Sequence, residues 1–248
     1  MNIRESEMPE FKALRLAVEA WARSILEESN PDYVETFRRR LAEPGCDVEK
    51  VLAETRELLE PAAAWHDVMT ALFDVEYWMD RCRQAVQYIG FAPRGGGRTA
   101  HPGVWLAYHT DSWHLFAYGL LDRIRKLITA VCRQVIRDGK EDAKWKIVET
   151  ALVGDIDKLK AVIEGTRNSI AHGGGIVEAL KEDKLLEPYI VLGGDEADAS
   201  SAIDIFASYY DGIAPHQARW HAGVHQSTVR IFAVSEALFK KLRQEAFS

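Results

Sequence analysis

The chain has 248 residues, of which 47% are hydrophobic, and this fits one large globular domain or one domain with extensions. Its formal net charge of −7 excludes a protein that coats nucleic acid through many phosphate contacts, but it allows a small phosphate-binding site. No apolar run approaches the roughly 18 residues that a membrane span needs, and the charged start MNIRESEMPE has no apolar signal region, so we expect a cytoplasmic protein with no membrane partner.

The first sixty residues have the apolar spacing of short amphipathic helices. Apolar residues recur every three or four positions from Glu10 to the interruption at Pro31 and predict a first helix. A shorter helix is expected over residues 33–41. Asp47 is a suitable N-cap for a third helix. We expect residues 1–60 to be an N-terminal helical extension.

Two long amphipathic helices are expected in the middle of the chain. The first opens at Pro61 and carries a continuous apolar stripe as far as Ile89. The Gly- and Pro-rich residues 91–103 are not expected to be regular structure, and the stretch is long enough for a functional loop. The second long helix is expected to start near Thr110 and to end at Arg137.

Shorter elements are expected after residue 140. A helical stretch leads to Gly154, where the pattern predicts a break before another helix that ends at Gly173. Residues 186–194, LEPYIVLGG, could hold a short strand. Ser201 opens a further helix, and Pro215 can start the last one.

These helices predict the fold class. Long amphipathic helices with short connections bury their stripes most simply against one another. We therefore expect an all-α protein, an antiparallel helical bundle with long core helices and additional N- and C-terminal helices. Residues 61–180 are expected to form the bundle core, and residues 181–248 a C-terminal segment with two helices that pack on it.

The stretch TRNSIAHGGG, residues 166–175, brings reactive side chains to the end of a predicted helix. Asn168 and His172 are four residues apart and lie on one side of that helix. Arg167 is about 140° from His172 in an ideal helix. The two can therefore meet at one anion only if the last turn is distorted or if a second subunit supplies the missing partner.

These residue types suit cleavage of a phosphodiester without a metal or a cofactor. His172 can exchange a proton near neutral pH and would activate a ribose 2′-hydroxyl. Arg167 presents a fixed fork of donors and would stabilise the charge that develops on the phosphate oxygens. Asn168 would support the geometry. Asp122 could orient a catalytic cation or pair with a neighbouring arginine.

The motif at Arg167, Asn168 and His172 resembles the R-x(4–6)-H motif of the HEPN superfamily. Residues 108–128, YHTDSWHLFAYGLLDRIRKLI, are also similar in character to an earlier core helix of HEPN-like proteins, and the resemblance covers about residues 61–175. Members of that superfamily are helical, often dimeric, and include metal-independent endoribonucleases of toxin–antitoxin, antiviral and RNA-processing systems. The resemblance implies an RNA or nucleotide ligand, a homodimer and a possible protein partner such as an antitoxin.

Three other interpretations stay open. The chain could be a non-catalytic HEPN-like module that binds a nucleotide, an RNA or a protein partner. His172 and Asn168 could simply cap a helix C-terminus. In the sequence PHQARWHAGVH, His221 and His225 are four residues apart and could face one metal ion from a helix, which would indicate a His-ligated metal-binding bundle.

Overall fold

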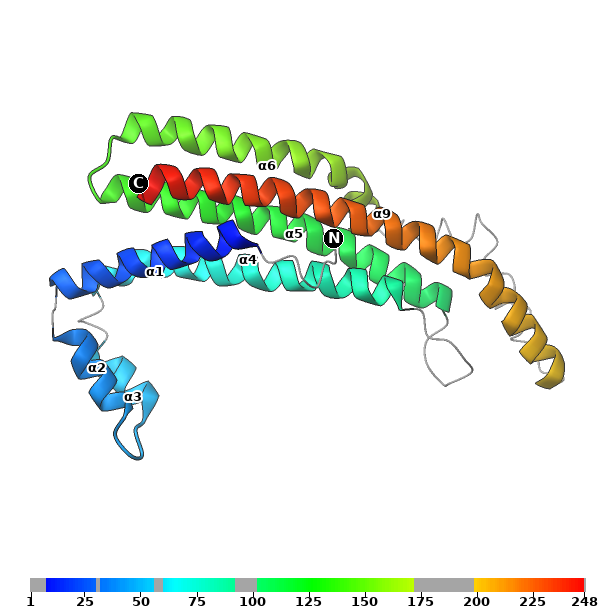
Figure 1. The fold of residues 1–248 in the computed structure, drawn as a ribbon, viewed down its shortest axis with the longest axis horizontal. Helices are drawn as coiled ribbons and strands as arrows, with labels where there is room; N and C mark the ends of the chain where they lie inside the picture. The colour runs from blue at the N-terminus through cyan, green and yellow to red at the C-terminus, as the bar shows by residue number, and fades with distance from the viewer. Residues whose placement is uncertain (1–7, 30–31, 56–59, 92–101, 172–198, 248) are drawn as a thin grey trace. The chain divides into compact units, whose positions relative to one another are not determined.

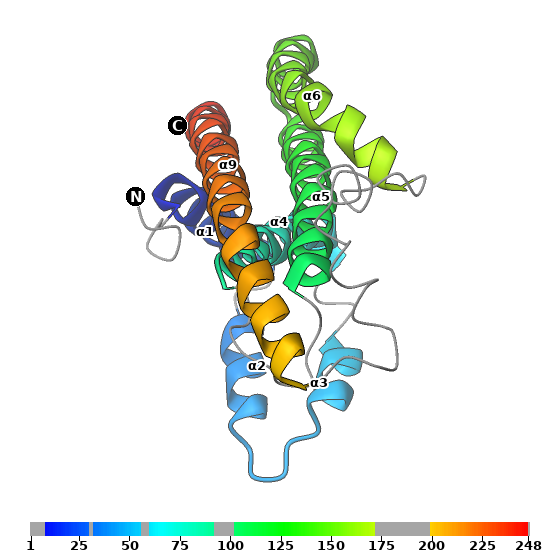
Figure 2. The ribbon, with the colours of Figure 1, turned by 90° about the vertical axis from the view of Figure 1, so that its right-hand side faces the viewer.

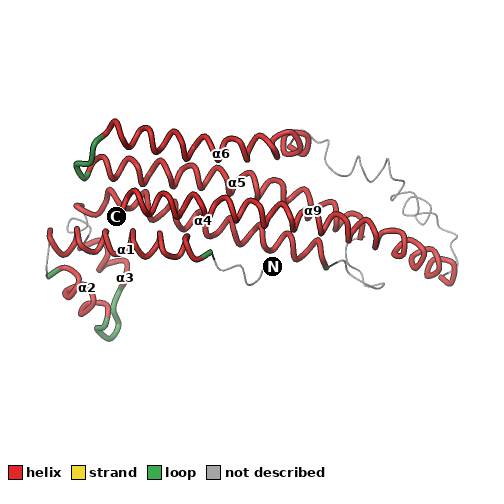
Figure 3. Tube along the Cα trace, turned by 45° about the horizontal axis from the view of Figure 1, so that its top comes forward, coloured by secondary structure: helices red, strands yellow, loops and turns green. Residues whose placement is uncertain are grey.

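The computed structural model describes residues 8–29, 32–55, 60–91, 102–171 and 199–247. Over these ranges the protein is an antiparallel helical bundle with long core helices and additional terminal helices, which confirms the predicted all-α class. Figure 3 shows helices and loops, and no strand, in the part of the chain that is described. The helices are labelled in Figure 1: α1 (Pro9–Ser29), α2 (Tyr33–Leu41), α3 (Val48–Thr55), α4 (Glu60–Gly90), α5 (Pro102–Arg137), α6 (Asp142–Ala171) and α9 (Ala199–Phe247).

The helices contribute to two compact units. Four of them, α4, α5, α6 and α9, give one segment to each unit, so neither unit is a continuous piece of chain. Within the described ranges, no helix combines the length and the apolar character that crossing a membrane requires. Unit 1 includes Glu76–Asp122 and Asp155–Ala233, and unit 2 comprises Glu7–Val75, Arg123–Gly154 and Val234–Ser248.

Unit 1 is held together by contacts between segments of different helices. The Trp78 ring of α4 packs on Phe116 of α5, with 5.8 Å between the ring centroids. The indole N–H of Trp113 donates to the Thr228 hydroxyl of α9 over 2.8 Å, and both groups are buried. Because a buried polar group needs a partner, this hydrogen bond fixes how α5 packs on α9.

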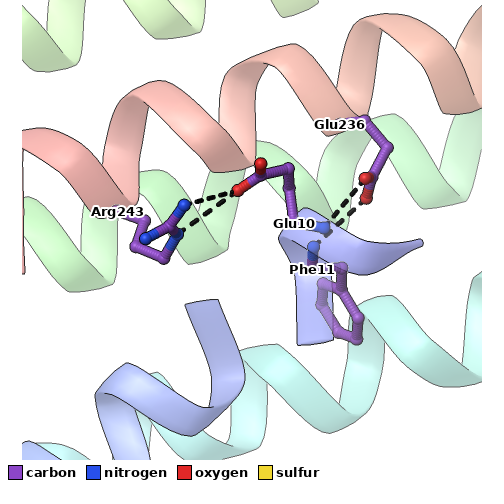
Figure 4. A network of polar contacts seen from close by, with 4 residues as sticks. All are labelled: Glu10, Phe11, Glu236 and Arg243. Carbon is purple, nitrogen blue, oxygen red and sulfur yellow. Dashed lines mark hydrogen bonds and ion pairs between the residues drawn. The ribbon is translucent and has the colours of Figure 1, made fainter. Parts of the chain in front are cut away.

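In unit 2 the first turn of α1 is held by the C-terminal part of α9. The Glu236 carboxylate accepts the backbone N–H groups of Glu10 over 2.9 Å and of Phe11 over 3.1 Å (Figure 4). Arg243, two turns further along α9, pairs with the Glu10 carboxylate at 2.8 Å. The rings of Phe11 and Phe239 also pack on each other, with centroids 5.2 Å apart. A side chain from another helix therefore caps α1.

The N-terminal helices follow the local sequence signals. The predicted N-cap is confirmed, because the Asp47 carboxylate accepts the backbone N–H of Lys50 over 3.1 Å. α2 has the predicted bounds, and it lies beside α3 in Figures 1 and 2. The apolar stripe predicted for α4 is confirmed, since all of its members are buried: Trp65, Val68, Leu72, Val75, Met79, Cys82, Val86 and Ile89.

The start of α5 was predicted wrongly. The helix begins at Pro102 and not near Thr110, so the last two residues of the stretch expected to be irregular are helical. Proline is favoured in the first turn of a helix, where its missing N–H would have no partner in any case. Leu106 is buried, which gives the added turns a place in the core. Residues 92–101 of the expected loop lie outside the described residues.

Two predicted helix breaks are also wrong. α6 runs through Gly154, because Leu152 and Ile156 are both fully buried and the packing outweighs a glycine penalty of about 1 kcal/mol. α9 runs through Pro215, and Figure 1 shows a bend in its gold-to-orange stretch, as expected for a proline inside a helix.

The predicted strand at residues 186–194 lies outside the described residues. The division into residues 1–60, 61–180 and 181–248 stays a prediction.

Candidate functional site

The first residues of the predicted motif lie in the part of α6 that the structure describes. Arg167 and Asn168 belong to this helix, which is described as far as Ala171, directly before His172. His172 itself lies outside the described residues, as do the side chains of Arg167 and Asn168. The geometry of these three groups therefore stays a prediction. Arg167 and Asn168 are helical, as the sequence analysis expected.

Asp122, the fourth predicted site residue, pairs with a lysine of α6. Its carboxylate lies 3.5 Å from the Lys160 ammonium group. The same ammonium group sits 4.5 Å from the ring centroid of Tyr118, one turn earlier on α5. The Lys160 side chain is only 13% exposed, so this cation is held between a carboxylate and an aromatic face. The sequence analysis expected a cation partner for Asp122 but not this lysine.

Helical register relates this anchored lysine to the motif. Lys160 and Arg167 are seven residues apart on α6, so an ideal helix directs both positions to within about 20° of one another. Asp122 therefore anchors α6 on α5 through Lys160, seven residues before Arg167. Its predicted role in orienting a catalytic cation stays a prediction.

The paired histidines of α9 do not meet further ligands among the described residues. The His221 and His225 rings lie 6.0 Å apart between centroids. His221 also approaches α4, where a Cβ on Gly90 would come within 2.9 Å of its Nε2. Burial, and next to it the charge of His225, lower the pKa of His221. In the part of the chain described, no group of three or more histidine, cysteine or carboxylate side chains could hold a metal ion.

An aromatic cluster at the end of α4 escaped the sequence analysis. The Trp105 indole N–H donates to the backbone carbonyl of Tyr88 over 2.9 Å, and the two rings meet edge to face at 5.9 Å. His109 packs against both rings, at 4.3 Å from Trp105 and 4.8 Å from Tyr88. Tyr108 contacts His109 at 5.1 Å. The only sequence signal was the density of aromatic residues at the start of α5.

Two histidines of α5 are kept away from the charged form. Burial lowers the pKa of His109 and of His114. In His114, Nδ1 lies 2.9 Å from the Thr110 carbonyl oxygen, which can only accept, so Nδ1 carries the proton. His114 therefore has a defined neutral tautomer.

Comparisons with known proteins identify no relative for this arrangement. No protein-family model matches the chain, no curated protein matches it, and no solved structure matches it. The residues themselves must therefore support any functional proposal.

Proposed function

We propose that this chain is a HEPN-like, metal-independent endoribonuclease whose site forms where two subunits meet. The observation that supports the proposal is that Arg167 and Asn168 belong to α6, a long helix of the bundle, and precede His172 by five and four residues. The glycines at 173–175 predict that the helix ends close to the motif, which would let the arginine and histidine turn toward one phosphate. A second subunit would bring the same residues from its own α6.

The chemistry follows from the side chains of the motif. His172 takes the proton of the ribose 2′-hydroxyl, whose oxygen then attacks the adjacent phosphorus atom. The bond from phosphorus to the 5′-oxygen breaks, and that oxygen receives a proton from the imidazolium. The products are a 2′,3′-cyclic phosphate and a 5′-hydroxyl. Arg167 stabilises the charge that builds up on the non-bridging oxygens, and Asn168 orients the neighbouring groups.

The test is cleavage of a panel of single-stranded and structured RNAs by the purified protein in the presence of EDTA. We expect products with cyclic phosphate ends, and a rate about 10²- to 10⁴-fold lower for His172→Ala, the range for loss of a general acid–base group. Arg167→Ala should give a comparable loss. A single 2′-deoxy substitution at the cleaved position should block the reaction, because the attacking oxygen is then missing.

A matched control comes from another Arg–His pair in the chain. Arg219 and His225 are six residues apart, against five for Arg167 and His172, and both lie in the interior of α9. Arg219→Ala and His225→Ala should leave cleavage unchanged. The proposal fails if no RNA is cleaved or if His172→Ala keeps full activity. RNA binding without turnover would indicate the non-catalytic module, and EDTA-sensitive activity that depends on His221 and His225 would indicate a metal site.

A further inference from the structure

Two tyrosines of α4 in unit 1 expose their rings on one side of the helix. Tyr77 is 52% exposed and Tyr88 is 45% exposed, and eleven residues separate them. Eleven residues are about three turns, so the two positions lie within about 20° of one another and about 16 Å apart along the helix. Between them lies the exposed Arg81, whose guanidinium group is 4.9 Å from the Tyr77 ring centroid. Its Nε donates to the Tyr77 hydroxyl over 2.9 Å.

The start of α5 extends this surface with further rings. Tyr108 is 65% exposed, while Trp105 and His109 are half-buried between it and Tyr88. Ring contacts and the hydrogen bond from the Trp105 indole N–H to the Tyr88 carbonyl hold the rings in place. The surface is therefore fixed before any ligand arrives. We call it the aromatic surface, and it consists of Tyr77, Arg81, Tyr88, Trp105, Tyr108 and His109.

The chemical character of the aromatic surface limits what it can bind. Its side chains combine flat rings with donors at their edges, namely phenol hydroxyls and a guanidinium group, and none of them is aliphatic or acidic. The neighbouring carboxylate of Asp80 is paired with Arg83 at 2.7 Å. A ligand for such a surface has exposed π-faces and hydrogen-bonding edges. Unpaired nucleobases have both properties, and they stack on aromatic side chains and on arginine.

We propose that the aromatic surface binds unpaired bases of single-stranded RNA, as a binding site separate from the motif at the end of α6. This inference rests on the proposed function in taking RNA as the ligand. Tyr77 and Tyr88 stand far enough apart to contact different nucleotides. Duplex RNA is excluded because its bases are already stacked inside the helix and present no free face. The neutral state favoured for His109 by burial suits stacking on an uncharged ring.

The test measures binding without turnover, in the full-length chain carrying His172→Ala. Fluorescence anisotropy follows fluorescein-labelled oligouridine and oligoadenosine of twelve nucleotides, and a duplex of the same length. We expect both single strands to bind more tightly than the duplex. Tyr88→Ala and Tyr108→Ala should each weaken single-strand binding by roughly 5- to 150-fold, the range for loss of one base–aromatic stack. Tyr88→Phe should keep the affinity, because the ring remains.

Controls separate stacking from damage to the fold. The control residues are Ile147 and Val162 of α6, which do not belong to the aromatic surface and are each 71% exposed. Their alanine variants should bind RNA with the affinity of the parent chain. Far-ultraviolet circular dichroism checks each variant. If Tyr88→Ala does not fold, the affinity of Tyr108→Ala tests the inference instead. The Tyr108 ring is more exposed than the Tyr88 ring, so its loss disturbs the fold less. A second measurement is quenching of Trp105 fluorescence by the RNA, which should be lost in Trp105→Phe.

Three results would overturn the inference. The first is equal affinity for duplex and single-stranded RNA. The second is unchanged affinity for single-stranded RNA in both tyrosine variants. The third is a change from dimer to monomer in sedimentation when Tyr88 or Tyr108 is replaced. The last result would make the surface a subunit contact. The proposed function fails in a different way, by absence of cleavage that depends on His172, so the two failures are distinguishable.

Discussion

Glu236 of α9 caps the first turn of α1 by accepting the backbone N–H of Phe11, which lies 225 residues earlier in the chain (Figure 4). The same carboxylate accepts the N–H of Glu10. The first N–H groups of a helix have no partner within the helix, and a negative charge there also interacts favourably with the helix dipole. A single side chain thus supplies both effects from a distant part of the sequence.

Replacing this cap should destabilise unit 2. We expect Glu236→Ala to lower the free energy of unfolding by about 1–2 kcal/mol, because two N–H groups lose their acceptor. Glu236→Gln should lose less, since one oxygen remains. Urea denaturation followed by circular dichroism measures the change. The exposed Glu164 of α6, changed to alanine, is the control and should stay within about 0.5 kcal/mol of the parent. Equal stability of Glu236→Ala and the parent would contradict the capping role.

Two glycines predict opposite effects of the same substitution. A Cβ on Gly119 would lie 2.6 Å from the Trp78 ring, which packs against Phe116 and cannot easily move. Gly119→Ala should therefore destabilise the protein by about 1–3 kcal/mol through overpacking. A Cβ on Gly154 would meet no atom within 4 Å beyond its chain neighbours and the backbone of its own helix, so Gly154→Ala should stabilise by up to about 1 kcal/mol. Thermal unfolding of both variants tests this, and the same sign for both would refute it.

The contact between Lys160 and Asp122 should be energetically coupled. A double-mutant cycle with Lys160→Met and Asp122→Asn is expected to give a coupling free energy of about 0.5–1 kcal/mol, because the lysine is largely buried. The exposed pair of Lys158 and Asp155 is the matched control. Its distance is shorter, 2.9 Å, but its side chains are solvated, so its coupling should be smaller. A larger coupling in the control pair would show that burial does not decide the strength here.

Stability should fall in mild acid because of His114. Burial lowers the pKa of His114 from 6.5 in the folded protein, so below pH 6.5 the unfolded chain binds a proton that the folded chain does not. The free energy of unfolding should therefore decrease as the pH falls from 7.5 through 6.5 toward the lower folded value. His114→Asn keeps a donor for the Thr110 carbonyl and removes the titration. Urea denaturation at several pH values should show a shallower slope for this variant, and identical slopes would disprove the contribution.

The three cysteines should differ in reactivity toward thiol reagents. Burial raises the pKa of the Cys82 thiol far above its ordinary value, and burial with the nearby charge of Glu149 raises the pKa of Cys132 to about 12. Cys46 lies in the turn between α2 and α3 and is not buried. Iodoacetamide at pH 8 should label Cys46 first, because only thiolates react. Peptide mass spectrometry checks the order, and early labelling of Cys82 in the folded protein would contradict the buried site.

Structural features that depend on residues close together in the sequence could be predicted from it. Features that depend on packing between helices could not. The apolar stripe of α4 and the N-cap at Asp47 follow from spacing and side-chain chemistry within a few residues. The continuity of α6 at Gly154 depends on burial of the residues on either side, which outweighs the glycine. Pro215 likewise stays inside α9, where the sequence suggested a start.

The same distinction applies to the candidate sites. Residue types alone drew attention to Arg167, Asn168 and His172, and the helix that carries the first two was expected. The aromatic surface depends on the antiparallel pairing of α4 with α5, which brings Trp105 onto Tyr88 across seventeen residues. No spacing rule within one helix reveals such a contact. The partner of Asp122 was missed for the same reason, since Lys160 lies on another helix.

The capping of α1 by Glu236 has a consequence for biosynthesis. At translation speeds of about 5–20 residues per second, the 225 residues that separate Phe11 from its acceptor take roughly 10–45 seconds to make. During that time the first turn of α1 is hydrated or engaged by other molecules. The unit that contains it can close only after the glutamate has left the ribosomal tunnel, so this part of the protein matures late even though its first helix is made early.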